Sequence, residues 1–134
     1  ATQFVKKLKE AGTEEVVILH VIDDRTIHSL ERYTAQYADV SLVVRDIREK
    51  ALQAIDPIEE ELRESGLKVK IRVEHGIPFS RILQVEEEEN VALTVIGSHG
   101  KSNIAGMLLG SVSEKVIRKS KKPVIVIKRE NAGL

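Results

Sequence analysis

Glycines and hydroxyls are spaced through residues 91–111 in a way that suits phosphate binding. Residues 91–96 form an apolar run, which predicts a short strand buried on both faces. Gly97 ends this run, Gly100 comes after two further residues, and Gly110 after nine more. Glycines at such points allow a ligand to come close to the backbone.

A helical pattern begins at Ser111, directly after the last of these glycines. Residues 111–114 read S-x-x-E, the form of a capping box, so we expect Ser111 to be the N-cap and Glu114 to close the box. The free N–H groups and the positive end of the helix dipole would then face the glycines. We interpret the arrangement as a phosphate cradle; the alternative is a tight turn that merely needs glycine.

Two better-known phosphate loops do not fit this segment. Gly100-Lys101-Ser102 looks like the end of a Walker A loop, but that loop needs a glycine where this chain has Val95. The dinucleotide motif G-x-G-x-x-G is also absent, because two residues separate Gly97 from Gly100. What the chain contains is G-x2-G-x9-G-S.

With this motif the sequence resembles the universal stress protein family, specifically its ATP-binding branch. The resemblance covers nearly the whole chain and also includes a strand end (HVID, residues 20–23), a turn (HGIP, residues 75–78) and a terminal strand (PVIVIK, residues 123–128). It implies that ATP binds with its adenine and ribose at the carboxyl ends of the first two strands and its phosphates in the glycine loop. The non-binding branch of the family lacks the motif.

The resemblance also implies roles for individual residues. Val21 would meet the adenine through its backbone, while other motif positions would lie along the ribose and phosphates. For Ser98 and Lys101, phosphate contact and a solvated loop position are both open. The carried-over positions are Val21, Gly97, Ser98, His99, Gly100, Gly110, Ser111 and Val112. We expect Mg²⁺ or Mn²⁺ to be held by the phosphate oxygens, because the sequence has no cluster of histidines and carboxylates to bind an ion independently.

Helical and strand patterns alternate along the chain, which predicts an α/β fold with an open, Rossmann-like parallel sheet and right-handed crossovers. The expected strands are residues 16–22, 67–74, 91–96 and 123–127, and the expected helices are 4–11, 25–65 with a break near 39, 78–90 and 111–122. The resemblance implies the adenine-nucleotide alpha hydrolase-like strand order 3-2-1-4-5. The chain opens inside what resembles the family's first helix, so we expect the first, central strand to lie in a segment preceding this sequence.

Some local features leave alternatives. Asp56-Pro57 either starts a fresh capped helix or lies in a continuous helix with a proline kink, and we favour the second. Residues 67–74 alternate between apolar and mostly charged side chains, which is typical of an edge strand protected by outward lysines. Residues 86–89 are four glutamates in a row, which we expect to form a solvated surface.

Composition narrows the class of protein. A chain of 134 residues, 42% of them hydrophobic, is most simply one domain, residues 1–134. Without cysteine there are no disulfides and no thiolate sites. The 21 basic and 21 acidic residues cancel, and two Phe and two Tyr offer little for base stacking, so we expect no nucleic-acid partner. No apolar run is long enough to cross a membrane, and we expect a cytoplasmic protein.

Three classes of function remain at this point. We favour an ATP-binding regulatory or stress-response module over a slow ATPase or other nucleotide-dependent enzyme, because only His99 in the loop could act as a general base. The third class is an interaction protein whose site stays empty, which the intact glycine spacing argues against. We also expect a homodimer through the last strand, since in the family's strand order its outer edge is unpaired.

Overall fold

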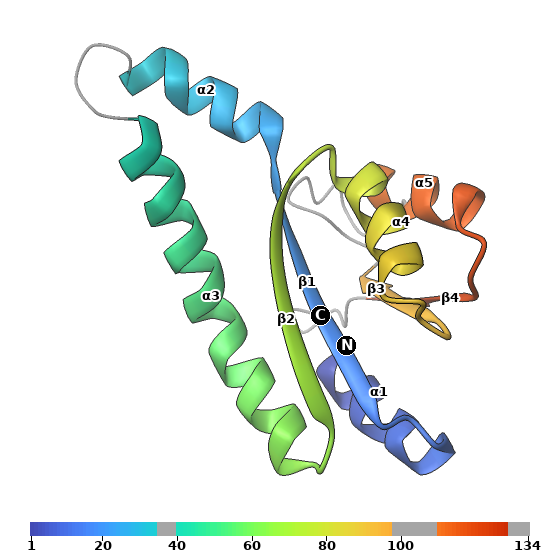
Figure 1. Cartoon of the computed structure of the whole chain (residues 1–134). Coiled ribbons are helices and arrows are strands. Elements are labelled where there is room, and N and C mark those ends of the chain that lie inside the picture. The colour runs from blue at the N-terminus through green and yellow to red at the C-terminus, as the bar shows by residue number, and fades with distance from the viewer. Residues whose placement is uncertain (35–39, 98–109, 129–134) are drawn as a thin grey trace, which may run out of the picture. The chain divides into compact units, whose positions relative to one another are not determined.

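The structure is a computed structural model that describes residues 1–34, 40–97 and 110–128 (Figure 1). Two compact units make up the chain, Thr2–Arg81 and, together with Ala1, Ile82–Leu134. Each unit is described by itself below. Among the described residues, no helix is long and apolar enough to cross a bilayer.

The first unit is built on two parallel strands. Its elements are α1 (Thr2–Leu8), a 3₁₀ turn η1 (Lys9–Ala11), β1 (Glu15–Asp23), α2 (Asp24–Thr34), α3 (Val40–Glu64) and β2 (Lys68–Gly76). The register pairs Glu15 with Lys68 at one end and Asp23 with Gly76 at the other. This parallel pair confirms the α/β prediction for this half of the chain. The break that we expected near residue 39 lies outside the described residues.

Backbone direction in this pair follows from one hydrogen bond. The N–H of Lys68 donates to the carbonyl of Glu14 over 3.0 Å. Because backbone groups alternate along a strand, odd-numbered residues of both β1 and β2 turn their N–H and C=O groups away from the partner strand.

α3 runs along one face of the β1–β2 pair (Figure 1). Ala51 and Ile55 of the helix pack with Ile22 and Val73 of the strands in one buried cluster. A second cluster contains Leu62, Leu67 and Val69. The helix is continuous through Pro57, so the predicted continuity is confirmed and the fresh helix start is wrong; the kink stays a prediction. Burial of this apolar stripe offsets the backbone hydrogen bond that proline cannot donate.

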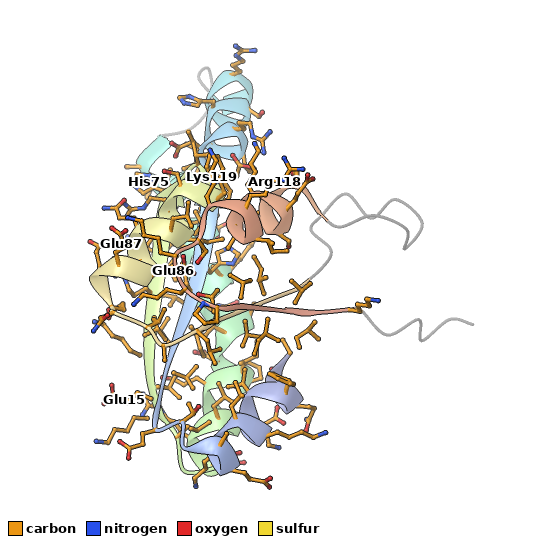
Figure 2. The ribbon with its side chains drawn as sticks, turned by 90° about the vertical axis from the view of Figure 1, so that its right-hand side faces the viewer. Glu15, His75, Glu86, Glu87, Arg118 and Lys119 are labelled. Carbon is orange, nitrogen blue, oxygen red and sulfur yellow. The ribbon has the colours of Figure 1, made fainter. Side chains whose placement is uncertain are left out.

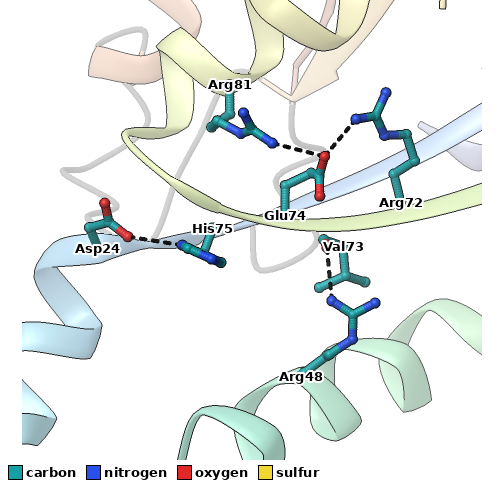
Figure 3. Close-up of polar contacts among 7 residues, drawn as sticks. All are labelled: Asp24, Arg48, Arg72, Val73, Glu74, His75 and Arg81. Atoms are coloured by element: carbon teal, nitrogen blue, oxygen red, sulfur yellow. Dashed lines mark hydrogen bonds and ion pairs between the residues drawn. The ribbon is translucent and has the colours of Figure 1, made fainter. Parts of the chain in front are cut away.

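The open edge of β2 is covered by arginines from α3. Arg63 donates to the carbonyl of Val69 over 2.8 Å, and Arg48 donates to the carbonyl of Val73 over 3.0 Å (Figure 3). Both carbonyls belong to odd-numbered residues and therefore face away from β1. The exposed Lys68 and Lys70 are the expected edge protection, and the arginines add a second form of it.

The second unit contains the other parallel pair. Its elements are β3 (Thr94–Gly97), α5 (Ser111–Lys119) and β4 (Val124–Ile127), with most of α4 (Pro78–Glu88), whose first turn belongs to the first unit. Thr94 pairs with Val124 and Gly97 with Ile127. In the expected strand order β1 is next to β2, and β3 is next to β4, as found. Among the described residues these are two separate two-stranded sheets.

β3 starts later than the apolar run suggested, so the strand prediction for residues 91–93 is wrong. The turn that ends α4 uses this part of the chain: Val91 N–H donates to the carbonyl of Glu86 over 3.2 Å. Asn90 takes a left-handed conformation with φ of 46°, which asparagine tolerates better than most residues. The strand begins where Thr94 N–H reaches the carbonyl of Pro123.

Glu86 is buried, with 5% of its surface exposed, so its expected place in a solvated glutamate run is wrong (Figure 2). Its carboxylate accepts a hydrogen bond from Thr94 Oγ1 and another, over 3.0 Å, from Ser120 Oγ. A buried carboxylate needs such donors, and these come from the start of β3 and the end of α5. Glu87 beside it is exposed, as expected, and lies 3.7 Å from Lys121.

Candidate functional site

The end of β3 and the start of α5 are joined by a side chain. Ser113 Oγ donates to the carbonyl of Gly97 over 2.6 Å. Gly97 is odd-numbered in a strand whose even-numbered residues bond to β4, so its carbonyl faces away from that ladder. The structure therefore brings together two parts of the glycine motif, Gly97 and the helix start at Gly110.

α5 presents free N–H groups at its first turn. The first intrahelical bond runs from Glu114 N–H to the carbonyl of Gly110 over 2.9 Å. The N–H groups of Ser111, Val112 and Ser113 precede that first bond, and the first N–H groups of an α-helix have no acceptor within the helix. Three backbone donors at the positive end of a helix dipole can hold an anion.

The capping-box prediction is wrong. The helix begins at Ser111 itself, and the N-cap is Gly110, which has φ −59°, ψ 150° and no side chain to cap with. Ser111 lies exposed at the first helical position. A glycine N-cap has no side chain to accept from the N–H groups of the first turn, and within the residues that the structure describes the hydroxyl of Ser111 does not cap them.

Gly97 has room for a side chain. A Cβ built on it would meet no atom within 4 Å, and its φ lies outside the left-handed region. Neither the backbone conformation nor a neighbouring group among the described residues requires glycine here. By contrast, Gly76 has φ of +145°, and a Cβ there would come within 2.8 Å of Arg81. The backbone conformation and this neighbour therefore explain glycine at position 76.

Val21 lies in the first unit, near the carboxyl end of β1, and is half-buried. It pairs with Glu74, but as an odd-numbered residue it turns its own N–H and C=O away from β2. Within the described part of the chain, β1 has no second neighbouring strand. The backbone of Val21 is therefore available at the position where the resemblance places adenine.

Three of the expected site residues, Ser98, His99 and Gly100, lie outside the described residues, as does Lys101. No group of three or more histidines and carboxylates that could hold a metal ion occurs in residues 1–34, 40–97 and 110–128.

Sequence reasoning missed Ser113. Ser113 is 4% exposed, and Val116, three residues later, is fully buried, so both side chains lie on the buried face of the helix. Of the two serines at the helix start, the sequence analysis assigned a function to Ser111 and none to Ser113. The three-residue spacing from Ser113 to the apolar Val116 is the signal that could have identified Ser113.

Polar side chains also gather where β1 and β2 end (Figure 3). His75 Nδ1 lies 3.5 Å from Asp24 Oδ1, and both side chains are largely exposed. Glu74 Oε1 accepts from Arg72 over 2.6 Å and from Arg81 over 2.9 Å. The hydrogen bond from Arg72 is the main cause that lowers the pKa of Glu74, aided by the charges of both arginines and opposed by burial.

Comparison with known proteins shows what this chain resembles as a whole. The family model described as the universal stress protein family matches residues 1–128. Universal stress protein MJ0577 of Methanocaldococcus jannaschii is 38% identical over 142 residues, which cover 98% of this chain and 88% of the relative. The solved structure of MJ0577 superimposes with a TM-score of 0.84 at 41% identity, over 98% of this chain and 87% of that one.

Two further solved structures share the fold at lower identity. A universal stress protein in complex with cAMP gives a TM-score of 0.63 at 21% identity, over 96% of this chain and 84% of that one. The universal stress protein of Archaeoglobus fulgidus in complex with dAMP gives 0.63 at 19% identity, over 95% and 84%.

Proposed function

Because this chain belongs to the universal stress protein family, we propose that it is an ATP-binding regulatory module of the stress response. The whole of residues 1–134 would form one domain of this family. The phosphates of ATP would bind between the end of β3 and the first turn of α5. The backbone of Val21 is proposed as an adenine contact from the family resemblance alone.

The observation that carries this proposal is the open glycine at the end of β3. No described residue requires glycine at position 97, and this glycine is joined through Ser113 to a helix whose N-cap, Gly110, has no side chain to cap the first N–H groups. A phosphate bound there would explain both facts, since it needs close approach to the backbone and supplies the missing acceptors.

Roles for the remaining motif residues follow from the resemblance. Ser111 and Val112 would donate backbone N–H groups to the terminal phosphates, with the Ser111 hydroxyl as a further donor. Ser98, His99 and Gly100 would lie along the ribose and phosphates. Mg²⁺ or Mn²⁺ would bind to the phosphate oxygens rather than to a site made by the protein.

The complexes with cAMP and dAMP were obtained with proteins that are 21% and 19% identical to this chain, which is evidence for a common fold and does not identify a ligand of this chain. The proposal of ATP rests on the resemblance of the spacing G-x2-G-x9-G-S in this sequence to the ATP-binding branch of the family.

The test is a comparison of Gly97→Val with the unaltered protein. Valine suits a strand, and a Cβ at this position meets no described atom within 4 Å, so the variant should unfold with nearly the same free energy in urea without ligand. With Mg-ATP at 100 times the dissociation constant, the unaltered protein should gain about 2.7 kcal/mol and the variant much less. Equal stabilisation of both proteins would refute the site, and no stabilisation of either would refute ATP binding.

A second variant, Gly110→Val, checks the other side of the cradle. The backbone of Gly110 has φ −59° and ψ 150°, which valine adopts readily, so the protein should again fold. A β-branched side chain at the N-cap would crowd the free N–H groups, and ATP binding should weaken as it does in Gly97→Val.

A further inference from the structure

We propose that Ser113 is a positioning residue for phosphate binding: its hydroxyl holds the carbonyl of Gly97 and so fixes where the free N–H groups of α5 stand. The inference rests on the proposed function, because it assigns a role within the same site. The side chain of Ser113 is buried and is not expected to touch the ligand, whereas its backbone N–H is one of the three free donors.

The geometry supports this role in two ways. First, the hydrogen bond of 2.6 Å connects the last residue of β3 with the third residue of α5, so strand end and helix start move together. Second, it keeps an electronegative carbonyl oxygen occupied. An unpaired carbonyl at the mouth of an anion site would repel phosphate, whereas a carbonyl that accepts from a hydroxyl is turned away and satisfied.

Ser120 at the other end of the same helix provides a matched comparison. Its hydroxyl donates to Glu86, which also accepts from Thr94 at the start of β3. The start of α5 is therefore bonded directly to the end of β3 by Ser113, and its C-cap Ser120 reaches the start of β3 only through Glu86 of α4. Only the bond of Ser113 lies beside the glycines. Removing either hydroxyl should lower stability, and removing that of Ser113 should in addition weaken phosphate binding.

The experiment measures binding of Mg-ATP, inorganic tripolyphosphate and adenosine by calorimetry, and unfolding by urea without ligand. We expect Ser113→Ala to bind Mg-ATP and tripolyphosphate about tenfold more weakly, equivalent to about 1.4 kcal/mol. Its binding of adenosine should not change. Ser120→Ala should lose stability but keep both affinities within about twofold, and Ser113→Thr, which restores a hydroxyl, should bind nearly as the unaltered protein does.

Ser113→Cys guards against an alanine variant that fails to fold, because it nearly keeps the side-chain volume while a thiol is a weak donor. Its tripolyphosphate affinity should fall towards the alanine value. The inference is overturned if Ser113→Ala, or Ser113→Cys in its place, binds both phosphates as tightly as the unaltered protein. It is also overturned if Ser120→Ala weakens them equally. Failure of the unaltered protein to bind Mg-ATP would instead refute the proposed function, and this inference with it.

Discussion

Arg81 on α4 and Glu74 on β2 form an ion pair of 2.9 Å, and Arg72 of the same strand approaches the same carboxylate oxygen. The side chains of Glu74 and both arginines are mostly buried, with 19–28% of their surface exposed. Two guanidinium groups on one carboxylate stabilise its charged form, so the pKa of Glu74 is lowered from its usual range.

This lowered pKa predicts how stability depends on pH. Between the pKa of Glu74 in the folded protein and its usual value of about 4.3, the unfolded chain binds more protons than the folded one. The free energy of unfolding contributed by this group is therefore complete above about pH 5 and is lost as pH falls through the folded pKa. Urea unfolding from pH 7 to pH 3 should show a shallower acid loss in Glu74→Gln than in the unaltered protein; parallel curves would contradict this.

Removing the arginines that cover the edge of β2 should make the protein associate. In the double variant Arg48→Met, Arg63→Met, the carbonyls of Val69 and Val73 lose their donors, and the open edge should pair with other molecules. Each lost hydrogen bond should also cost about 1 kcal/mol of stability.

Sedimentation velocity at rising concentration measures this association. Arg45→Met is the control, because Arg45 is an exposed α3 arginine 3.6 Å from Glu49 and should leave the mass distribution unchanged. A double variant that sediments as the control does would show that the arginines do not protect the edge.

We expect a homodimer through the outer edge of β4, and one backbone N–H group on that edge provides a test. Thr94 N–H donates to the carbonyl of Pro123, so Ile125 faces β3 whereas Val126 turns its N–H outward. Val126→Pro removes that outward donor and keeps the ladder with β3, so it should give a folded monomer. Ile125→Pro should instead unfold this unit, and a dimer that survives Val126→Pro would exclude this surface.

Slow turnover is the prediction for the bound nucleotide. Fast phosphoryl transfer needs an oriented nucleophile, a fixed metal and a cation on the developing charge. The cradle offers backbone donors that bind ground state and transition state about equally, which gives affinity without rate. Steady-state ATP hydrolysis should stay below about 1 per second. His99→Ala should leave the rate unchanged, and loss of a measurable rate while ATP binding survives would make His99 catalytic.

The sequence predicted the elements of this fold well where one periodicity dominates. The strict alternation in β2 and the long apolar stripe of α3 predicted a strand and a helix, and both were confirmed. β3 was harder, because the backbone hydrogen bonds that end α4 reach Val91 and delay the strand. An apolar run shows what is buried but not which backbone groups an earlier turn has already used.

The candidate site was predicted in its glycines but not in its hydroxyls. By sequence pattern Ser111 fits the N-cap of a capping box, which would start the helix at Val112. The helix instead starts at Ser111, with Gly110 as its N-cap. Glu86 was hidden within four glutamates, because only the packing of Thr94 and Ser120 distinguishes it from its neighbours. Such partners are distant in sequence, and local patterns do not report them.

The two attachments of α5 also separate its two sides. Ser113 fixes the inner side of the helix to β3 directly and Ser120 through Glu86, while the outer side carries exposed charges such as Arg118, which lies 2.7 Å from Glu114 (Figure 2). Substitutions on that outer side can change the charge and shape of the surface without shifting the helix start. Relatives with the same glycines are therefore free to differ in the proteins that bind this surface while the proposed phosphate site keeps its geometry.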